Sequence, residues 1–93
     1  SLMYLFLGGA LAAKSDDIIG IFDMDTSTVK KVTRDFLNAA ERAHRTEYAN
    51  DELPKSFIVT DRFVYISPLN TSTLRRRAAG TGGTQQTKTE KEF

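Results

Sequence analysis

Residues 56–67 read Ser-Phe-Ile-Val-Thr-Asp-Arg-Phe-Val-Tyr-Ile-Ser, and this stretch decides the fold. Two runs rich in β-branched and aromatic residues, 56–60 and 63–67, flank the polar pair Asp61-Arg62. Such runs favour extended backbone, and a short polar break between them is typical of a turn that joins two antiparallel strands. The stretch therefore predicts a β-hairpin.

Three more strands are predicted in the N-terminal part of the chain. Residues 3–7 and 10–13 are separated by Gly8-Gly9, a pair that is typical of a tight turn. The run at 18–22 is rich in isoleucine and fits a largely buried strand. Because Gly20 interrupts this run, we expect a bulge or a close neighbouring backbone there.

The pattern then becomes helical, and it predicts one long helix over residues 28–45. Residues 25–27 carry side-chain oxygens for its N-cap, and the positive charge at residues 42–45 suits the negative end of the helix dipole. The spacing of its apolar residues by three and four is that of an amphipathic helix. The side chains expected to share the apolar face are Val29, Val32, Phe36, Ala40 and Ala43.

The C-terminal part of the chain contains a second helix signal. Pro68 ends the second strand of the hairpin, and residues 70–73 offer cap oxygens for a short helix over 74–79. Residues 80–93 contain no apolar anchor before Phe93, so we expect a disordered tail. The sequence thus predicts an α+β domain over residues 3–79. It consists of a small antiparallel sheet of short strands, one principal helix and a short C-terminal helix.

Length and composition restrict the class of protein. The chain has 93 residues, which is enough for one small core, and chains of this size often gain stability by oligomerising. It has no cysteine, which excludes disulfides and thiolate metal sites. The apolar run at residues 2–7 has no basic segment before it and is far shorter than the roughly 20 residues of a membrane span. We therefore expect a cytoplasmic protein that does not associate with membranes.

Residues that catalysis would need are few. His44 is the only histidine, and its place near the end of the predicted helix suits a surface or C-cap role. The pairs Asp16/Asp17 and Asp23/Asp25 have the residue types of an acid and base pair or of a cation site. Turns and helix N-termini also favour carboxylates at these positions. We expect no catalytic residue, no metal site and no cofactor.

Basic side chains are the strongest indication of function in the residue chemistry. The net charge of the whole chain is +1, but residues 53–79 contain five basic residues and one acidic residue, a local balance of +4. The triplet at 75–77 could contact phosphate or carboxylate groups, and a solvated helix end explains it equally well. The candidate DNA-binding residues are Lys55, Arg62, Arg75, Arg76 and Arg77, together with Lys30, Lys31 and Arg34 near the start of the predicted helix.

Several segments carry a further signal through their content, order and spacing. They are Tyr4-Leu5-Phe6-Leu7-Gly8-Gly9, Asp17-Ile18-Ile19-Gly20-Ile21-Phe22-Asp23, Leu53-Pro54-Lys55-Ser56-Phe57-Ile58-Val59-Thr60, Tyr65-Ile66-Ser67-Pro68-Leu69 and Ser72-Thr73-Leu74-Arg75-Arg76-Arg77. Together they resemble the RemA and RemB family of extracellular-matrix regulators of bacterial biofilms. The similarity is closest to the RemB branch and covers residues 3 to about 79.

The resemblance implies a small α+β domain that assembles into a ring and acts on the transcription of biofilm-matrix genes. In the RemA branch, an arginine before the third strand and an arginine pair before the later hairpin contact DNA. The corresponding positions here are Asp17 and Glu52-Leu53. Acidic and apolar side chains do not attract phosphate, so this part of the RemA mechanism does not carry over. Lys55 is the one basic residue in the equivalent loop.

Three classes of function remain, of which an enzyme has the least support because groups of titratable side chains are scarce. The first is a non-catalytic transcriptional regulator that binds duplex DNA as a ring-like homo-oligomer, so that modest basic contacts add through avidity. The second is an adaptor that regulates through protein contacts, for example by joining a DNA-binding paralogue. Salt-sensitive binding of duplex DNA by an oligomer would favour the first function.

Overall fold

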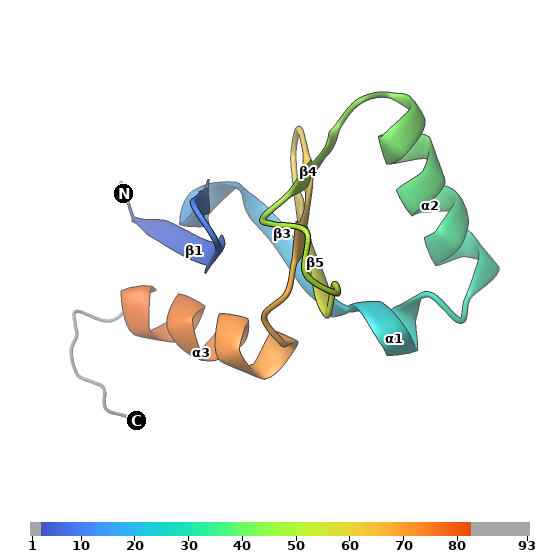
Figure 1. The fold of residues 1–93 in the computed structure, drawn as a ribbon. Coiled ribbons are helices and arrows are strands. Elements are labelled where there is room, and N and C mark those ends of the chain that lie inside the picture. Colours follow the sequence, from blue (N-terminus) through green and yellow to red (C-terminus); the bar gives the residue numbers. More distant parts are fainter. Residues whose placement is uncertain (1–2, 83–93) are drawn as a thin grey trace.

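A four-stranded sheet lies at the centre of the computed structural model, which describes residues 3–82 (Figure 1). Neighbouring strands are antiparallel except β4, which runs parallel to β6. The predicted hairpin of residues 56–67 forms the two inner strands, and the predicted α+β class is confirmed. Across the sheet, the strands are β3 (Ile18–Asp23), β5 (Ser56–Thr60), β6 (Val64–Ser67) and β4 (Thr46–Tyr48).

Different elements cover the two faces of this sheet, as Figure 1 shows. One face carries the separate hairpin of β1 (Tyr4–Gly8) and β2 (Leu11–Lys14), together with α3 (Thr71–Gly82). The other face carries α2 (Lys31–Arg42). The described part of the chain therefore has three layers. Two short helices flank β3 in the sequence, namely η1 (Ser15–Asp17) and α1 (Met24–Ser27).

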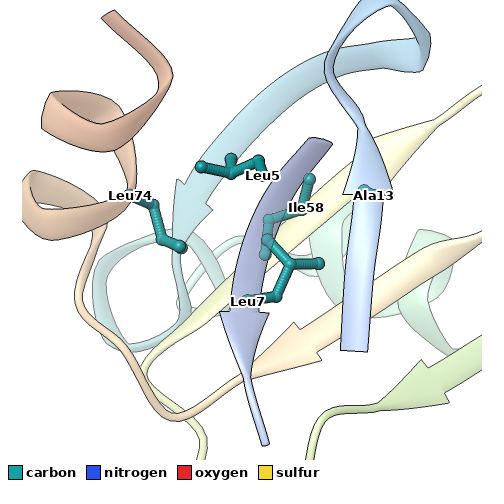
Figure 2. Packing of buried hydrophobic residues seen from close by; sticks show 5 residues of the cluster. All are labelled: Leu5, Leu7, Ala13, Ile58 and Leu74. Carbon is teal, nitrogen blue, oxygen red and sulfur yellow. The ribbon is translucent and has the colours of Figure 1, made fainter. Parts of the chain in front are cut away.

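Alternation along β5 divides the buried side chains between two clusters. Successive strand residues point to opposite faces, so Phe57 and Ile58 lie in different clusters. The cluster on the hairpin side, drawn in Figure 2, consists of Leu5, Leu7, Ala13, Ile58 and Leu74. The cluster on the α2 side consists of Ala40, Phe57, Val64 and Ile66.

A buried hydroxyl joins the β1–β2 hairpin to the central sheet. The register of β1 and β2 shifts between Phe6 and Gly8, so Leu7 has no Cα partner in β2. The Ser67 hydroxyl donates to the Leu7 carbonyl at 2.5 Å and accepts a hydrogen bond from the Leu69 backbone N–H at 3.0 Å. Ser67 and Leu7 are buried, so the bond between them satisfies polar groups that water does not reach.

Gly9 and Gly20 have close neighbours at the position of a missing Cβ. Gly9 in the β1–β2 turn has φ +55, and a Cβ there would lie 2.4 Å from the carbonyl oxygen of Ala49. The β3–β5 register shifts between Ile18 and Gly20, which confirms the predicted bulge. A Cβ on Gly20 would lie 2.6 Å from the ring of Phe22. A larger residue is therefore excluded at Gly9, where the contact is with backbone and φ is positive, whereas at Gly20 it would displace the Phe22 ring.

The single long helix predicted over residues 28–45 is wrong, because the chain forms α1 and α2 separately. The N-cap of α1 is Asp23, whose carboxylate accepts the Thr26 backbone N–H at 2.8 Å. The predicted capping segment 25–27 lies inside α1 instead. The Thr28 hydroxyl donates to the Met24 carbonyl at 2.6 Å, and this local bond competes with continued helix formation.

At its other end, α2 stops at Arg42, earlier than predicted. His44 follows with φ 58, and the Arg45 backbone N–H donates back to the Ala40 carbonyl at 2.9 Å. A left-handed residue with such a backward bond is common just after a helix C-cap. His44 therefore follows the C-cap residue Ala43, and its exposed side chain agrees with the predicted surface role. The early stop allows residues 46–48 to form β4, which was not predicted.

The apolar face expected on the long helix is largely uncovered. Val29 and Val32 are 72% and 73% exposed, and Phe36 is 44% exposed. Within this set only Ala40 is buried, at 8% exposure. The spacing identified a shared apolar pattern, but most of that pattern does not contribute to the core of one copy.

The C-terminal helix α3 is longer than predicted and continues to Gly82. It begins at Thr71, three residues earlier than predicted, and among the predicted cap residues Asn70 accepts the Thr73 backbone N–H through its side-chain oxygen at 2.9 Å. The predicted tail therefore begins inside the helix, and its remainder, residues 83–93, lies outside the described residues. No helix within residues 3–82 is long and apolar enough to cross a membrane.

Candidate nucleic-acid interface

The three arginines of α3 differ in what their side chains contact. Leu74 is fully buried and fixes α3 against the sheet, so the next three residues project around the exposed side of the helix. Arg75 Nη2 donates to the Ile21 carbonyl at 2.6 Å, and Arg77 Nη1 donates to the Phe6 carbonyl at 3.4 Å. Among residues 3–82, Arg76 makes no side-chain hydrogen bond or ion pair. Arg76 is therefore the fully available cation of the triplet.

The basic residues near the start of α2 are also partly engaged within the chain. Lys31 pairs with Asp35 at 2.7 Å, four residues along the helix. Arg34 Nη1 donates to the carbonyls of Thr28 and Val29 at 2.8 and 2.9 Å, which stabilises the connection between α1 and α2. The Lys30 side chain is exposed and has no such partner within the described range. Lys30 is thus the residue of this group whose charge is free for an external anion.

Lys55 and Arg62 lie at opposite ends of β5. Two hydrogen bonds hold the backbone of Lys55. The Lys55 N–H donates to the Ser67 carbonyl at 2.8 Å, and the Lys55 carbonyl accepts the Met24 N–H at 2.9 Å. Its side chain is exposed. Arg62 is exposed in the β5–β6 turn, where Arg45 Nε donates to its carbonyl at 2.6 Å. The Lys55 ammonium group and the Arg62 guanidinium group therefore project from backbone that hydrogen bonds hold in place.

Arg45 and Lys14 lie near Arg62 and are not among the predicted basic residues. Arg45 follows the α2 C-cap, and its exposed guanidinium contacts the β5–β6 turn. Lys14, Asp17 and Arg62 line a polar pocket of about 350 Å³. Early termination of α2 places Arg45 here, and a continuous helix over residues 28–45 could not have predicted it.

Carboxylates offset the positive charge of this pocket. Asp17 and Asp61 line it together with the cations and with Tyr65. Burial raises the pKa of the Tyr65 phenol, and the negative charges of Glu47, Asp17 and Asp61 raise it further. A phenol that stays protonated is a hydrogen-bond donor. The pocket therefore has mixed charge and is not a purely basic site.

The eight candidate residues do not form one cluster on a single copy. Figure 1 shows α2 and α3 on opposite sides of the sheet, so the cations near the start of α2 are separated from the arginines of α3. The β5 register places Lys55 and Arg62 at opposite ends of the strand. One copy therefore presents several separate basic points, and a continuous basic surface would require more than one copy.

Positions that carry arginine in the RemA branch are accessible here. Asp17 and Glu52 are exposed, and Leu53 is 81% exposed. Their location would allow contact with a partner, but they carry negative or apolar side chains. These exposed positions therefore carry no cation.

Comparison with known proteins identifies the family of this chain. No family model matches the sequence. Extracellular matrix regulatory protein B of Bacillus subtilis (strain 168) is 36% identical to it over 76 residues. The similarity covers 82% of this chain and 90% of that protein, so it includes nearly the whole length of the relative. The chain therefore belongs to the RemB family of extracellular matrix regulatory proteins.

Proposed function

We propose that this protein is a non-catalytic transcriptional regulator of biofilm extracellular-matrix genes, which acts in the cytoplasm as a ring-like homo-oligomer and contacts duplex DNA through basic side chains. Membership of the RemB family supports the regulatory part, because the Bacillus subtilis relative is named as an extracellular matrix regulatory protein. The described residues contain no group of three potential metal-ligating His, Cys, Asp or Glu side chains. Metal-dependent catalysis by such a group therefore has no support within residues 3–82.

The observation that carries the DNA-binding proposal is the set of exposed cations without intramolecular partners. Each makes no side-chain hydrogen bond or ion pair in the part of the chain that the structure describes, so its charge remains available for phosphate. Because these residues lie on separate parts of one copy, repetition around an oligomer is the way in which weak contacts add. Of the eight predicted residues, those in this set are Lys30, Lys55, Arg62 and Arg76.

Arg76→Ala is the cleanest single test of the α3 surface. It removes a free cation without breaking a hydrogen bond, and we expect weaker binding of duplex DNA with a salt slope that is smaller by about one. The measurement is DNA affinity at several salt concentrations, with light scattering on the same samples. Arg42→Ala is the matched control, because it removes the same charge from an exposed position on α2 that is not among the candidate residues. Unchanged affinity and slope for Arg76→Ala would exclude α3 from the DNA contact.

Arg75→Ala and Arg77→Ala do not serve the same purpose. These substitutions remove hydrogen bonds to Ile21 and Phe6, so they alter the attachment of α3 as well as the surface charge. A loss of DNA binding in either variant would therefore combine two effects. Only a variant whose unfolding free energy equals that of the wild type reports on DNA contact alone.

The alternative proposal is an adaptor that acts through protein contacts and does not touch DNA. The exposed Asp17, Glu52 and Leu53 favour it, because they replace the cations that the RemA branch uses at these places. An oligomer that ignores duplex DNA at low salt but binds a DNA-binding paralogue would support the adaptor and overturn the first proposal.

A further inference from the structure

The polar pocket that contains Arg62 lies between the β2–η1 segment and the β5–β6 turn. Its volume of about 350 Å³ is within the range of small-molecule sites in proteins, which is about 300–1,000 Å³. Cations and carboxylates line it in equal number, so its lining has no net formal charge. The cations are Lys14 and Arg62, and the carboxylates are Asp17 and Asp61.

The four charged side chains of the polar pocket do not neutralise one another by direct contact. Although they share one pocket, no two of them form an ion pair within residues 3–82. In the same part of the chain, Asp61 and Arg62 accept hydrogen bonds only through their backbone carbonyls, from Arg45. The charged ends of all four side chains are therefore open to a bound molecule.

The backbone around the polar pocket is held in place before any ligand arrives. Lys14 is a paired residue of β2. The Thr60 hydroxyl accepts the Phe63 backbone N–H at 3.0 Å and closes the β5–β6 turn, and Arg45 Nε donates to the Arg62 carbonyl at 2.6 Å. A site on ordered backbone loses less conformational entropy when it binds a ligand.

We propose that the polar pocket binds a small zwitterion of the α-amino acid type. Lys14 and Arg62 supply partners for the ligand carboxylate, and Asp17 and Asp61 supply partners for its ammonium group. The Tyr65 hydroxyl, which also lines the pocket, adds a neutral hydrogen-bonding group. The inference goes beyond the proposed function, because it concerns a small ligand and involves neither DNA nor a partner protein.

Ligands with one sign of charge fit the polar pocket less well. An anion that pairs with Lys14 and Arg62 also meets the two carboxylates, which repel it. The same argument applies to a DNA phosphate. A metal cation beside Asp17 and Asp61 meets the two basic side chains, and the described residues contain no group of three potential metal ligands. Only a ligand that carries both charges satisfies all four side chains.

The rest of the lining indicates what side chain the amino acid carries. Ala13 and the ring of Phe63 provide an apolar part of the pocket. The rings of Phe63 and Tyr65 are tilted by 36° with their centroids 6.1 Å apart. A third ring can extend such a tilted aromatic pair. An aromatic amino acid therefore combines the charges and the apolar group that the pocket can contact, and L-phenylalanine is the natural probe.

The test is isothermal titration calorimetry of the full chain in buffer without DNA. L-Phenylalanine should bind with a Kd on the order of 1 mM, as expected for a ligand of its size. Two analogues are matched controls, because 3-phenylpropanoate lacks the ammonium group and 2-phenylethylamine lacks the carboxylate. Each should bind at least about tenfold more weakly, since it leaves one pair of charged side chains without a partner. L-Alanine measures the contribution of the ring.

Variants of the chain locate the binding. Arg62→Gln and Asp17→Asn each remove one charge from the pocket at an exposed position, and each should weaken L-phenylalanine binding at least about tenfold. Arg76→Gln and Asp51→Asn are the matched controls, because they remove the same charges at exposed positions outside the pocket lining. Circular dichroism verifies the fold of all four variants.

The inference is supported if the zwitterion binds, both analogues bind more weakly, and only the two pocket variants lose affinity. A wild-type chain that binds neither amino acid at about 10 mM would overturn it. Equal binding of either analogue would show a site for one charge only and would also overturn it, as would equal affinity of the pocket variants and their controls. Because Arg62 is also a candidate DNA contact, the absence of DNA keeps the two proposals apart. Salt-sensitive DNA binding by a chain that ignores amino acids would refute the ligand site alone.

Discussion

Ser67→Ala is the substitution that most directly tests how the two sheets are held together. The Ser67 hydroxyl is the donor to the Leu7 carbonyl and the acceptor for the Leu69 N–H, and the residue has no exposed surface. Alanine keeps the β6 backbone but removes both hydrogen bonds. Each bond contributes about 1 kcal/mol, and each buried polar group left without a partner adds a penalty of about 1–3 kcal/mol. Some relaxation will recover part of this loss, so we expect destabilisation of about 2–4 kcal/mol.

That loss is a large part of the free energy of unfolding for a domain of this size, which is about 5–15 kcal/mol in general. The assay is urea unfolding followed by circular dichroism, in which the midpoint should fall while the slope stays constant. Ser72→Ala is the matched control, because the Ser72 hydroxyl donates to the exposed side chain of Asn70. It should change stability by no more than about 0.5 kcal/mol. A loss below about 1 kcal/mol for Ser67→Ala would refute the role assigned to the buried hydroxyl.

Two further predictions concern the core and acid stability. Leu74→Ala should destabilise the protein by about 2–5 kcal/mol, because Leu74 is fully buried and anchors α3. Leu53→Ala, at an 81% exposed position, is the control and should have little effect. Thermal unfolding of the two variants measures the difference. The hydrogen bond from the Thr26 backbone N–H lowers the pKa of Asp23 below its ordinary value of 3.8. The stability that this carboxylate contributes is therefore complete above that value and is lost as pH falls through the lower folded pKa. Asp23→Ala should lower the free energy of unfolding near neutral pH, and the difference in unfolding free energy from the wild type should shrink in strong acid. A difference that does not change with pH would contradict the role of the ionised Asp23 carboxylate as the cap of α1.

Local chemistry made the central hairpin and the N-cap region of α3 predictable. Residues 56–67 have strong strand preferences on both sides of a polar turn, and these preferences agree with the burial of Phe57 and Ile58 on opposite faces. Asn70 is a favourable N-cap residue and does cap α3. The bulge at Gly20 was also visible, because a glycine within a β-branched run marks such positions. Each of these features depends on neighbours within a few residues.

The central helix shows where the sequence pattern was insufficient. Val29, Val32 and Phe36 have helical spacing, and the same spacing serves a core, an interface or an open groove. The pattern also extended across the break between α1 and α2, where hydrogen bonds of Asp23 and Thr28 fix a separate first turn. Helix propensity alone does not indicate where such side-chain hydrogen bonds to the backbone compete with a continuous helix.

β4 was missed for a different reason. Residues 46–48 are only three in number, and their partner β6 lies nearly twenty residues further along the chain. Parallel pairing of such a short segment has no local turn signal to reveal it. The positive φ of His44 ends α2 and sends the chain into β4, but histidine is not the residue that usually marks a left-handed cap. Arg45 was consequently absent from the predicted basic site.

The sequence predicted which basic residues lie at the surface, but not which of them are free of partners within the chain. All eight proposed cations belong to exposed residues. The sequence could not indicate that Arg75, Arg77 and Arg34 donate to backbone carbonyls or that Lys31 pairs with Asp35. These partners depend on how α3 and the α1–α2 connection pack. The charge count therefore overestimated the number of free cations.

The packing of β1 against α3 also determines when the domain can fold during its synthesis. Leu5 and Leu7 share their cluster with Leu74, and Arg77 contacts the Phe6 carbonyl. Ribosomes add about 5–20 residues per second, so about 3–13 s pass between the synthesis of Leu7 and that of Leu74. During this interval the first hairpin lacks the helix that completes its cover. Native closure of the domain must therefore wait until α3 has left the ribosome, and the nascent chain exposes the apolar side chains of β1 until then.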